Sequence, residues 1–383
     1  MMRTHSQSSH KKDIISFVLR TSSQIRSRVD VGAGAIADAG TILKQQDAGD
    51  KVLVLSQNEV AGFHGGPLLE SLTGAGYSVD SLLLPSGEEC KSSNQLLQIW
   101  QKLQTLGFTR NDTLVALGGG AVSDVAGFAA STYLRGIKSM LIPTTLLSQV
   151  DAAIGGKTGI NLGAGKNLAG TFHLPDVTLV DTELLKTLPE REVRSGLGEI
   201  IKYAFIERTI SDATEFRGGP RPFLKILEET IAAGFKLDDP SVASIIATCI
   251  KMKLAVVGKD LREGRLRRCL NLGHTLAHGL EKVSNYSISH GEAVAIGLAF
   301  AADLSESQGR LQAESAQRLK TVLQKAALPI ERPSSFEKAK VLEAIAFDKK
   351  KEGSTIKFVL PVEPIGTVDL DTSFSLEQLA EHL

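Results

Sequence analysis

Short apolar runs alternate with longer amphipathic stretches through the first half of the chain, and this alternation constrains the fold more than any other feature. The stretch 93–106 carries Leu96, Trp100 and Leu103 at helical spacing. The runs around it have the length and composition of buried strands, and they are residues 51–56, 113–117, 139–143 and 177–181. Strands that alternate with helices form a parallel sheet with helices on its faces. The pattern therefore predicts an α/β domain.

The second half of the chain has a different pattern. From about residue 184 onward, apolar residues recur at helical spacing, as do Ile246, Ile250 and Leu254. A short strand is expected at residues 356–360. Because no repeat or low-complexity linker separates the halves, we expect a tight boundary near residues 181–190, followed by an all-α domain.

Charge and cysteine content exclude some classes of protein. Lys+Arg and Asp+Glu are equal at 43 each, so nucleic acid is not an expected partner. Every uncharged run is shorter than the roughly 18 residues that cross a bilayer, so no membrane span is predicted. The three cysteines are odd in number and lack metal-type spacing, which favours reduced thiols and a cytoplasmic location.

The N-terminus allows two interpretations. Residues 1–23 are rich in Ser, Arg and Lys, and Asp13 is their one acidic residue. This composition resembles an organellar transit peptide. A frayed terminus, or a first strand around residues 14–19, is the favoured alternative.

Three consecutive glycines, Gly118 to Gly120, stand between a predicted strand and a predicted helix. At such a position backbone N–H groups and the helix dipole can hold a phosphate. The match to the dinucleotide-binding fingerprint is imperfect, because Ser123 takes the place of the third glycine and no acidic residue ends the next strand. We predict nucleotide binding, with a tight structural turn as the alternative.

The segment 155–159 contains the Gly-Lys-Thr that ends a Walker A loop, but that motif also needs a glycine where this chain has Asp151. A P-loop is therefore excluded. The surrounding segment still has a composition that suits an anionic or polyhydroxylated ligand, with several glycines and the polar residues Asp151, Lys157, Asn161, Lys166 and Asn167. A solvated loop is the alternative.

Histidines gather in one part of the second half. His274 and His278 are four residues apart and share a helix face, as metal ligands can. With His290 and a carboxylate such as Glu199, two histidines would form a site that leaves a coordination position open for catalysis. Lys202 follows Glu199 by one turn, and both could be helix-surface charges. Spacing alone does not select the ligands.

Together these segments resemble the 3-dehydroquinate synthase family, the sugar-phosphate cyclases of the shikimate pathway. The resemblance runs from about residue 28 to the end and is densest at residues 118–128, 135–137, 143–151, 155–161, 199–203, 270–275 and 290–297. It implies a tail (1–27), a Rossmann-like nucleotide-binding α/β domain (28–183), a helical metal- and substrate-binding domain (184–383), and a site in the cleft between the domains.

The resemblance also implies residue roles. The metal ligands, for Zn²⁺ or Co²⁺, would be Glu199, His274 and His290. NAD contacts would fall on Asn58, Glu88, Lys91, Gly119, Gly120, Asp124, Thr144, Thr145, Asp151, Lys157 and Lys166. The catalytic and substrate-binding set would be Asp151, Lys157, Lys166, Asn167, Lys202, Lys253, Glu263, Arg267, Asn271 and His278. The substrate phosphate would meet Arg135, from a homodimer partner, with Lys349 and Lys350.

The chain departs from the family pattern at two positions beside the nucleotide. Ser56 stands where the family often has an acidic residue, and Ser123 stands where it often has glycine. Neither position performs the chemistry, so the departures concern details of cofactor contact.

The implied reaction converts 3-deoxy-D-arabino-heptulosonate 7-phosphate to 3-dehydroquinate and phosphate, by transient oxidation with NAD, phosphate elimination, reduction and aldol closure. Lys253 and Arg267 suit the substrate carboxylate, which cyclases of carboxylate-free sugars do not bind. Three alternatives remain: another sugar-phosphate cyclase, a metal-dependent polyol dehydrogenase of related fold, and a non-catalytic protein on the same fold.

Overall fold

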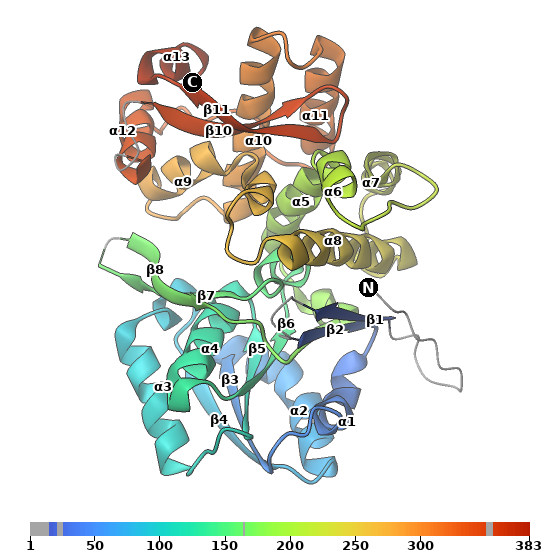
Figure 1. Ribbon diagram of the computed structural model, residues 1–383, viewed down its shortest axis with the longest axis vertical. Coiled ribbons are helices and arrows are strands. Elements are labelled where there is room, and N and C mark those ends of the chain that lie inside the picture. Colours follow the sequence, from blue (N-terminus) through green and yellow to red (C-terminus); the bar gives the residue numbers. More distant parts are fainter. Residues whose placement is uncertain (1–14, 21–25, 164, 350–354) are drawn as a thin grey trace. The chain divides into compact units, whose positions relative to one another are not determined.

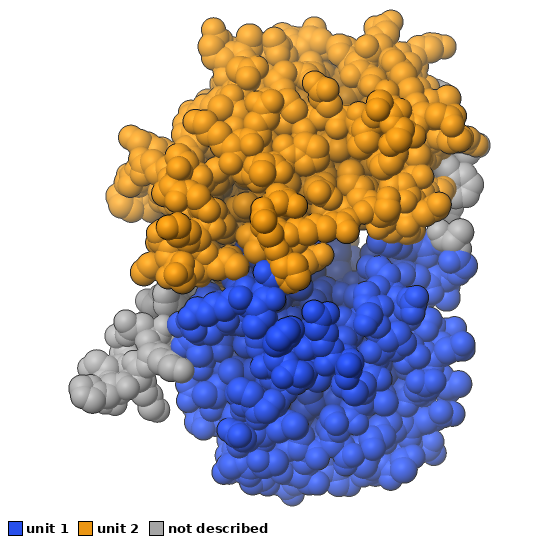
Figure 2. Space-filling view, turned by 180° about the vertical axis from the view of Figure 1, so that it is seen from behind, with its two compact units in different colours: residues 1–188 blue, residues 189–383 orange. Residues whose placement is uncertain are grey.

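The computed structural model describes residues 15–20, 26–163, 165–349 and 355–383. It divides into two compact units, Met1–Leu188 and Pro189–Leu383, which are coloured separately in Figure 2. The division after Leu188 lies within residues 181–190, where a boundary is expected, whereas the family resemblance implies a boundary between residues 183 and 184. That point lies inside a short 3-10 helix, Thr182–Thr187, whose Leu184 is buried in the core of the first unit. These residues therefore belong to the first unit.

The first unit is built on a seven-stranded sheet with the strand order β1-β2-β9-β6-β5-β3-β4 (Figure 1). β1 pairs antiparallel with β2 and the other pairs are parallel. The strands are β1 (Ile15–Arg20), β2 (Arg26–Gly32), β3 (Lys51–Gln57), β4 (Ser78–Leu84), β5 (Thr113–Gly118), β6 (Lys138–Pro143) and β9 (Val177–Asp181). The predicted α/β architecture is confirmed. β1 lies within the predicted tail, while residues 1–14 fall outside the described part of the chain.

Helices cover both faces of this sheet, because alternate residues of the central strands point to opposite sides. Leu53 and Leu55 of β3 join one buried cluster and Val52 and Val54 join the other. The first cluster packs under α3 (Ser93–Thr105) and α4 (Gly120–Thr132), and the second under α1 (Ala39–Lys44) and α2 (Asn58–Gly74). Strands buried on both faces are typical of parallel sheets.

A separate hairpin completes the first unit. β7 (Lys157–Leu162) and β8 (Gly165–Phe172) pair antiparallel, and β7 packs on α4. A π-helical turn, Ser148–Ala152, precedes the hairpin. Much of the polar segment that the sequence singled out is therefore strand rather than loop.

The second unit is mostly helical, as predicted. Its helices are α5 (Glu190–Ala204), α6 (Glu207–Ala213), α7 (Phe223–Ala232), α8 (Pro240–Lys259), α9 (His274–Val283), α10 (His290–Ser307), α11 (Ala313–Lys325), α12 (Lys338–Lys349) and α13 (Leu376–His382). The expected strand near residue 356 is β10 (Ile356–Val362), and it pairs with a second strand, β11 (Thr367–Phe374), that was not predicted. Figure 1 shows this hairpin surrounded by helices of the same unit.

Among the described residues, one helix is long and apolar enough to cross a membrane by length and composition. This helix is α8, and 61% of its apolar window is buried inside the structure. Burial of Ile245, Ile246, Ile250 and Val256 explains its composition, because core helices are apolar on most sides.

Candidate active site

Three side chains of the second unit bring their ligand atoms to one point. Glu199 lies in α5, and His274 and His290 are the first residues of α9 and α10. Oε1 of Glu199 lies 3.4 Å from Nε2 of His274 and 3.2 Å from Nε2 of His290. One ligand atom from each residue lies within 4.8 Å of the others. Two imidazoles and a carboxylate form the donor set of a catalytic Zn²⁺ site with an open position.

Close helix contacts make this convergence possible. A Cβ on Gly198 would lie 2.4 Å from the carbonyl oxygen of Gly291, and a Cβ on Gly291 would lie 1.9 Å from that of Ser195. Both glycines adjoin a ligand, Glu199 and His290. Only residues without a side chain let α5 and α10 approach this closely, so the sequence encodes the approach at the ligands themselves.

The hydrogen bonds of the imidazoles favour metal binding. Nδ1 of His274 donates to the carbonyl oxygen of Leu272 at 3.1 Å. A carbonyl only accepts, so Nδ1 carries the proton and Nε2 keeps its lone pair. His290 repeats the arrangement, with Nδ1 3.4 Å from Oε1 of Glu281. Both Nε2 atoms therefore face Glu199, and the residues fit a divalent cation.

Glu199 supplies the negative charge that a cation at this cluster needs. Burial favours a higher pKa for Glu199, but the Lys202 ammonium and the two histidines outweigh it and hold that pKa well below its usual value. Burial lowers the pKa of His274 to about 3, against the opposing charge of Glu199. Burial also acts to lower the pKa of His290, but hydrogen bonds to Glu199 and Glu281 raise it to about 10. Glu199 is therefore an ionised carboxylate in the protein interior.

His278, the other member of the four-residue pair, is not part of this group of ligand atoms. Its side chain is exposed, and its ring centroid lies 5.7 Å from that of His274. The ring of His290 lies closer to His274, at 5.3 Å, although it is on another helix. In the structure, His274 therefore lies closer to His290, which is distant in sequence, than to His278 on the same helix.

The other substrate residues predicted for the second unit lie on α5, α8 and the segment before α9. Lys202 is 1% exposed and is hydrogen-bonded to Glu199, and Lys253 is 5% exposed. Asn271 donates from Nδ2 to Oε1 of Glu263 at 2.6 Å, and Glu263 has a φ of 61°. Arg267 is 1% exposed and donates from Nη1 to the carbonyl of Leu261 at 2.7 Å.

Asp260, which was not among the predicted residues, holds the backbone of residues 264–267. Its Oδ1 accepts the backbone N–H of Gly264 at 2.7 Å, and its Oδ2 accepts those of Arg265 at 2.7 Å and Arg267 at 3.0 Å. Three backbone bonds to one carboxylate fix the path of the chain between Glu263 and Arg267. An acidic residue directly after a long helix, followed by a glycine, is the signal that could have revealed it.

In the first unit, the glycine turn, Gly118 to Gly120, lies where the order of the strands in the sheet reverses. The chain leaves β3 toward β4 on one side and returns to β5 on the other, so the carboxyl ends of β3 and β5 form the switch point at which α/β sheets bind ligands. Asn58 follows β3, while Gly119 and Gly120 follow β5. Three predicted nucleotide contacts therefore meet at this edge.

The turn is shaped for close approach. A Cβ on Gly119 would lie 3.2 Å from Cγ2 of Thr145, and the N–H of Thr144 donates to the carbonyl of Gly118 at 3.0 Å. Among the described residues, no side chain caps the first turn of α4. Its N–H groups and the helix dipole suit a phosphate, so this part of the first unit fits a nucleotide.

A polar cluster joins the other predicted contacts of the first unit. Lys91, which is 3% exposed, donates to Asp124 at 2.6 Å and also to Oδ1 of Asn167. Lys166 lies 3.8 Å from Glu88. Asn161, which was noted in the sequence but given no role, links the two parts: its Nδ2 donates to Glu88 at 2.9 Å, and its Oδ1 accepts the N–H of Asn167 at 2.9 Å.

The two departures from the family pattern have structural explanations. Ser56 is buried inside β3, and its hydroxyl donates to the carbonyl of Leu117 on β5 at 2.8 Å. Ser123 donates to the carbonyl of Gly119 at 3.2 Å, within the first turn of α4. Both hydroxyls therefore bond to backbone beside the glycine turn.

The remaining predicted residues are Asp151, Lys157, Arg135, Lys349 and Lys350. Lys157 begins β7 and is exposed, and Asp151 lies in the π-helical turn and is half-buried. Arg135 is exposed at the end of the short 3-10 helix Tyr133–Arg135 and has a φ of 65°. The side chains of Lys349 and Lys350 lie outside the described residues.

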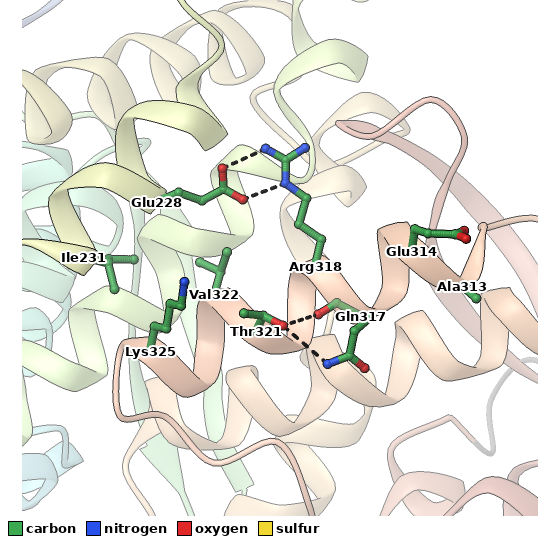
Figure 3. A pocket seen from close by; sticks show the side chains of 9 residues that line it. All are labelled: Glu228, Ile231, Ala313, Glu314, Gln317, Arg318, Thr321, Val322 and Lys325. Carbon is green, nitrogen blue, oxygen red and sulfur yellow. Dashed lines mark hydrogen bonds and ion pairs between the residues drawn. The ribbon is translucent and has the colours of Figure 1, made fainter.

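The second unit also has a pocket with a different lining (Figure 3). It has a volume of about 720 Å³ and lies between α7 and α11. Nε and Nη2 of Arg318 donate to the two carboxylate oxygens of Glu228 at 2.6 and 2.7 Å. None of the residues that line it belongs to the predicted site, so its size does not identify the active site.

Comparisons with known proteins identify the family of the chain. Residues 81–195 match the family model of the 3-dehydroquinate synthase N-terminal domain, and residues 196–351 match that of the C-terminal domain. The 3-dehydroquinate synthase of a Synechococcus strain is 40% identical over 359 residues, which cover 93% of this chain and 94% of the relative. That of Thermococcus kodakarensis is 46% identical over 288 residues, or 75% of this chain and 76% of the relative.

Solved structures share the fold at lower identity. A 2-deoxy-scyllo-inosose synthase complexed with carbaglucose-6-phosphate, NAD⁺ and Co²⁺ has a TM-score of 0.83 at 23% identity, over 96% of this chain and 98% of that one. A 2-epi-5-epi-valiolone synthase from Streptomyces hygroscopicus with NAD⁺ and Zn²⁺ bound has a TM-score of 0.81 at 24% identity, over 99% and 98%. With matched family models and relatives over nearly its whole length, the chain belongs to the 3-dehydroquinate synthase family of sugar-phosphate cyclases.

Proposed function

We propose that this protein converts 3-deoxy-D-arabino-heptulosonate 7-phosphate to 3-dehydroquinate and phosphate, with NAD and a divalent cation as cofactors. The observation that carries the proposal is the convergence of Glu199, His274 and His290 in a chain of this family. The reaction eliminates phosphate from carbon, so the enzyme would be a lyase. Its redox steps cancel, so no net oxidation is expected.

The cofactor assignment has two supports. The donor set in the second unit fits Zn²⁺ or Co²⁺, and the glycine turn in the first unit fits a nucleotide phosphate. Two cyclases of the same fold contain NAD⁺ with Co²⁺ or Zn²⁺. When bound, NAD would accept and return a hydride, and the cation would act as a Lewis acid on the substrate alcohol.

The side chains of the second unit account for recognition of a sugar acid. Arg267 is held by its backbone through Asp260 and by its guanidinium through Leu261. A guanidinium has five N–H donors, so it can keep the bond to Leu261 and still bind a carboxylate by two parallel bonds. Lys253 would add a second positive charge. A neutral sugar offers no anionic group for these two cationic side chains to recognise, which disfavours cyclases of neutral sugars.

The phosphate requires cationic and amide donors. Lys157, Asn167 and His278 carry these groups, and the departing phosphate itself can accept the proton of the neighbouring carbon–hydrogen bond. Asn167 has a φ of 55° and accepts a hydrogen bond from Lys91, so its side chain is held in one orientation. These residues would bind and orient the leaving group. The later ring closure needs confinement of the open-chain intermediate more than further catalytic groups.

The remaining predictions concern the assembly and the location of the enzyme. We propose a homodimer in which Arg135 of one subunit reaches the substrate phosphate of the other; its exposed position at the end of a short 3-10 helix is compatible with this role. We also propose a cytoplasmic location, which three buried cysteines without disulfide partners support.

One assay distinguishes the proposed reaction from its alternatives. The purified protein is supplied with the heptulosonate phosphate, NAD⁺ and Co²⁺, and both phosphate release and NADH absorbance are followed. We expect one phosphate per substrate consumed without accumulation of NADH. A polyol dehydrogenase would accumulate NADH, and a cyclase of carboxylate-free sugars would release phosphate only from such a sugar. Either result would contradict the proposal.

A further inference from the structure

A buried carboxylate stands behind the metal cluster, and none of the roles assigned above uses it. Glu281 lies on α9, about two helical turns after His274, and is 7% exposed. Burial of a carboxylate is unfavourable unless hydrogen bonds or charges compensate it. Its Oε1 lies 3.4 Å from Nδ1 of His290, on the neighbouring helix α10.

The imidazole of His290 therefore stands between two carboxylates. Its Nε2 faces Glu199, from α5, at 3.2 Å, and its Nδ1 faces Glu281, from α9. A histidine that binds a metal through one nitrogen donates the other N–H to an acceptor, which fixes both the tautomer and the ring orientation. The position of Glu281 is that of this acceptor.

The two histidine ligands differ in how they are held. His274 donates to the backbone carbonyl of Leu272 at 3.1 Å, so the backbone fixes the orientation of its imidazole ring. The orientation of His290 depends on a side chain instead. A carboxylate also carries a negative charge, which makes the imidazole a stronger ligand than a neutral acceptor does.

We infer that Glu281 is a positioning residue that orients His290 toward the divalent cation and strengthens its binding. The inference rests on the metal site of the proposed function and adds a residue that neither spacing nor family resemblance identified. Glu281 acts through His290 and does not itself contact the cation or the substrate.

Another carboxylate near His290 serves as a matched control. Glu292 lies two positions after His290, but its Oε2 accepts the N–H of Ser289 at 2.9 Å, while the hydroxyl of Ser289 accepts the N–H of Glu292 at 3.3 Å. This capping box engages Glu292 at the start of α10. Glutamine retains the acceptor of a capping box, so Glu292→Gln removes one negative charge near His290 while preserving the helix start.

The experiment compares Co²⁺ affinity among three full-length proteins, the wild type, Glu281→Gln and Glu292→Gln. Each is stripped of metal with a chelator, confirmed as folded by circular dichroism, and titrated with Co²⁺ in competition with a chromophoric chelator. We expect Glu281→Gln to bind Co²⁺ about 10- to 100-fold more weakly. Glu292→Gln should bind like the wild type. Because the defect is in metal occupancy, the kcat of Glu281→Gln should recover when Co²⁺ is raised to saturation.

Each outcome has a defined meaning. Equal Co²⁺ affinity of Glu281→Gln and the wild type overturns the inference but leaves the metal site in place. Absence of Co²⁺ binding by the wild type itself overturns the proposed function as well. If Glu281→Gln does not fold, Glu281→Asp replaces it; the shorter side chain keeps the charge but moves it from Nδ1, so wild-type affinity in that variant also overturns the inference.

Discussion

At the scale of single residues, a buried ion pair lies beside the metal cluster. Lys202 and Glu199 are hydrogen-bonded and 1% and 0% exposed. Removing one partner of a buried pair leaves an uncompensated charge, which costs more than the pair contributes. The same two residue types form an exposed pair at Lys186 and Glu183, with the same spacing in sequence and exposures of 52% and 45%.

The difference in burial between these two ion pairs predicts a difference in how much each lysine contributes to the free energy of unfolding. Lys202→Met should lower the free energy of unfolding of the metal-free protein by about 3 kcal/mol, and Lys186→Met should change it by less than about 1 kcal/mol. Urea unfolding in the presence of a chelator measures both. Similar values for the two variants would show that Glu199 is not charged in the metal-free protein.

Arg267 allows a prediction about activity that is independent of the metal. Loss of hydrogen bonds to a charged group corresponds to a decrease of about 100-fold in kcat/KM for Arg267→Ala. Arg267→Lys should also be impaired, because an ammonium lacks the planar fork. The metal content of both variants, measured by atomic emission, should match the wild type. Near-normal turnover of Arg267→Ala would contradict its role with the substrate carboxylate.

At the scale of secondary-structure elements, the metal site depends on how closely α5, α9 and α10 approach. Every proposed ligand has a glycine as its neighbour in sequence: Gly198, Gly273 and Gly291. A Cβ on Gly297 would lie 1.9 Å from the carbonyl oxygen of Gly273, which brings the start of α9 against α10. The site is therefore built by backbone contacts between helices, and a side chain at any of these positions separates them.

This packing predicts the effect of one added methyl group. Gly291→Ala places a Cβ 1.9 Å from the carbonyl of Ser195, so α10 must move and His290 with it. The variant should lose most of its Co²⁺ binding. Gly62→Ala is the control: it lies inside α2, no described atom lies within 4 Å of its new Cβ, and alanine should stabilise that helix by up to about 1 kcal/mol. Full metal occupancy of Gly291→Ala would contradict the packing argument.

The contact of α2 with the 3-10 helix Thr182–Thr187 predicts a pH dependence of stability. Burial lowers the pKa of His64, against the opposing charge of Asp181, and Nε2 of His64 lies 2.9 Å from the hydroxyl of Thr187. Because the pKa is lower in the folded than in the unfolded protein, the unfolded state binds protons first as the pH falls. The contribution of His64 is thus complete above the unfolded pKa of about 6.5 and is lost as the pH falls toward the folded value.

Urea unfolding of the wild type and His64→Gln at pH 7.5 and 5.5 tests this direction. The wild type should lose more stability between the two values than the variant, whose side chain does not titrate. An equal loss would show that His64 binds its proton as readily in the folded protein.

At the scale of the whole molecule, the chain consists of two units with separate cores, and its cysteines are divided between them. Cys90 is buried in the first unit, and Cys249 and Cys269 are buried in the second. Burial raises the pKa of Cys90 and of Cys269 to about 12. Alkylation requires the thiolate, so the native thiols should react slowly.

Alkylation with iodoacetamide at pH 8 followed by mass spectrometry checks this expectation. The native protein should remain unmodified over minutes, and the denatured protein should take up three labels, one for each cysteine. In intermediate urea, the position of the first label identifies the unit that opens first. Rapid labelling of Cys90 in the native protein would contradict its buried state.

The fold class could be predicted from the sequence because its signals are local. A buried strand between amphipathic helices shows in consecutive residues, as in the runs that became β3, β5, β6 and β9. The nucleotide-binding turn was visible for the same reason, since three glycines follow one strand directly. β11 was missed because it has no continuous apolar run: of its residues only Val368, Leu370 and Phe374 are apolar. The family resemblance named the metal ligands, but it offered no physical reason for them.

Local spacing indicated His274 and His278 as a pair, whereas the family resemblance indicated Glu199, His274 and His290, and only the tertiary structure supplies the physical reason. A metal site needs ligand atoms that converge on one point, and that convergence depends on the packing of helices far apart in the sequence. Glu199 meets His274 and His290 because α5, α9 and α10 touch through glycine backbone. The sequence by itself determined the layered α/β unit, the helical unit and the residue types of the site. The approach of the helices determined which of those residues form it, and it revealed Glu281 behind them.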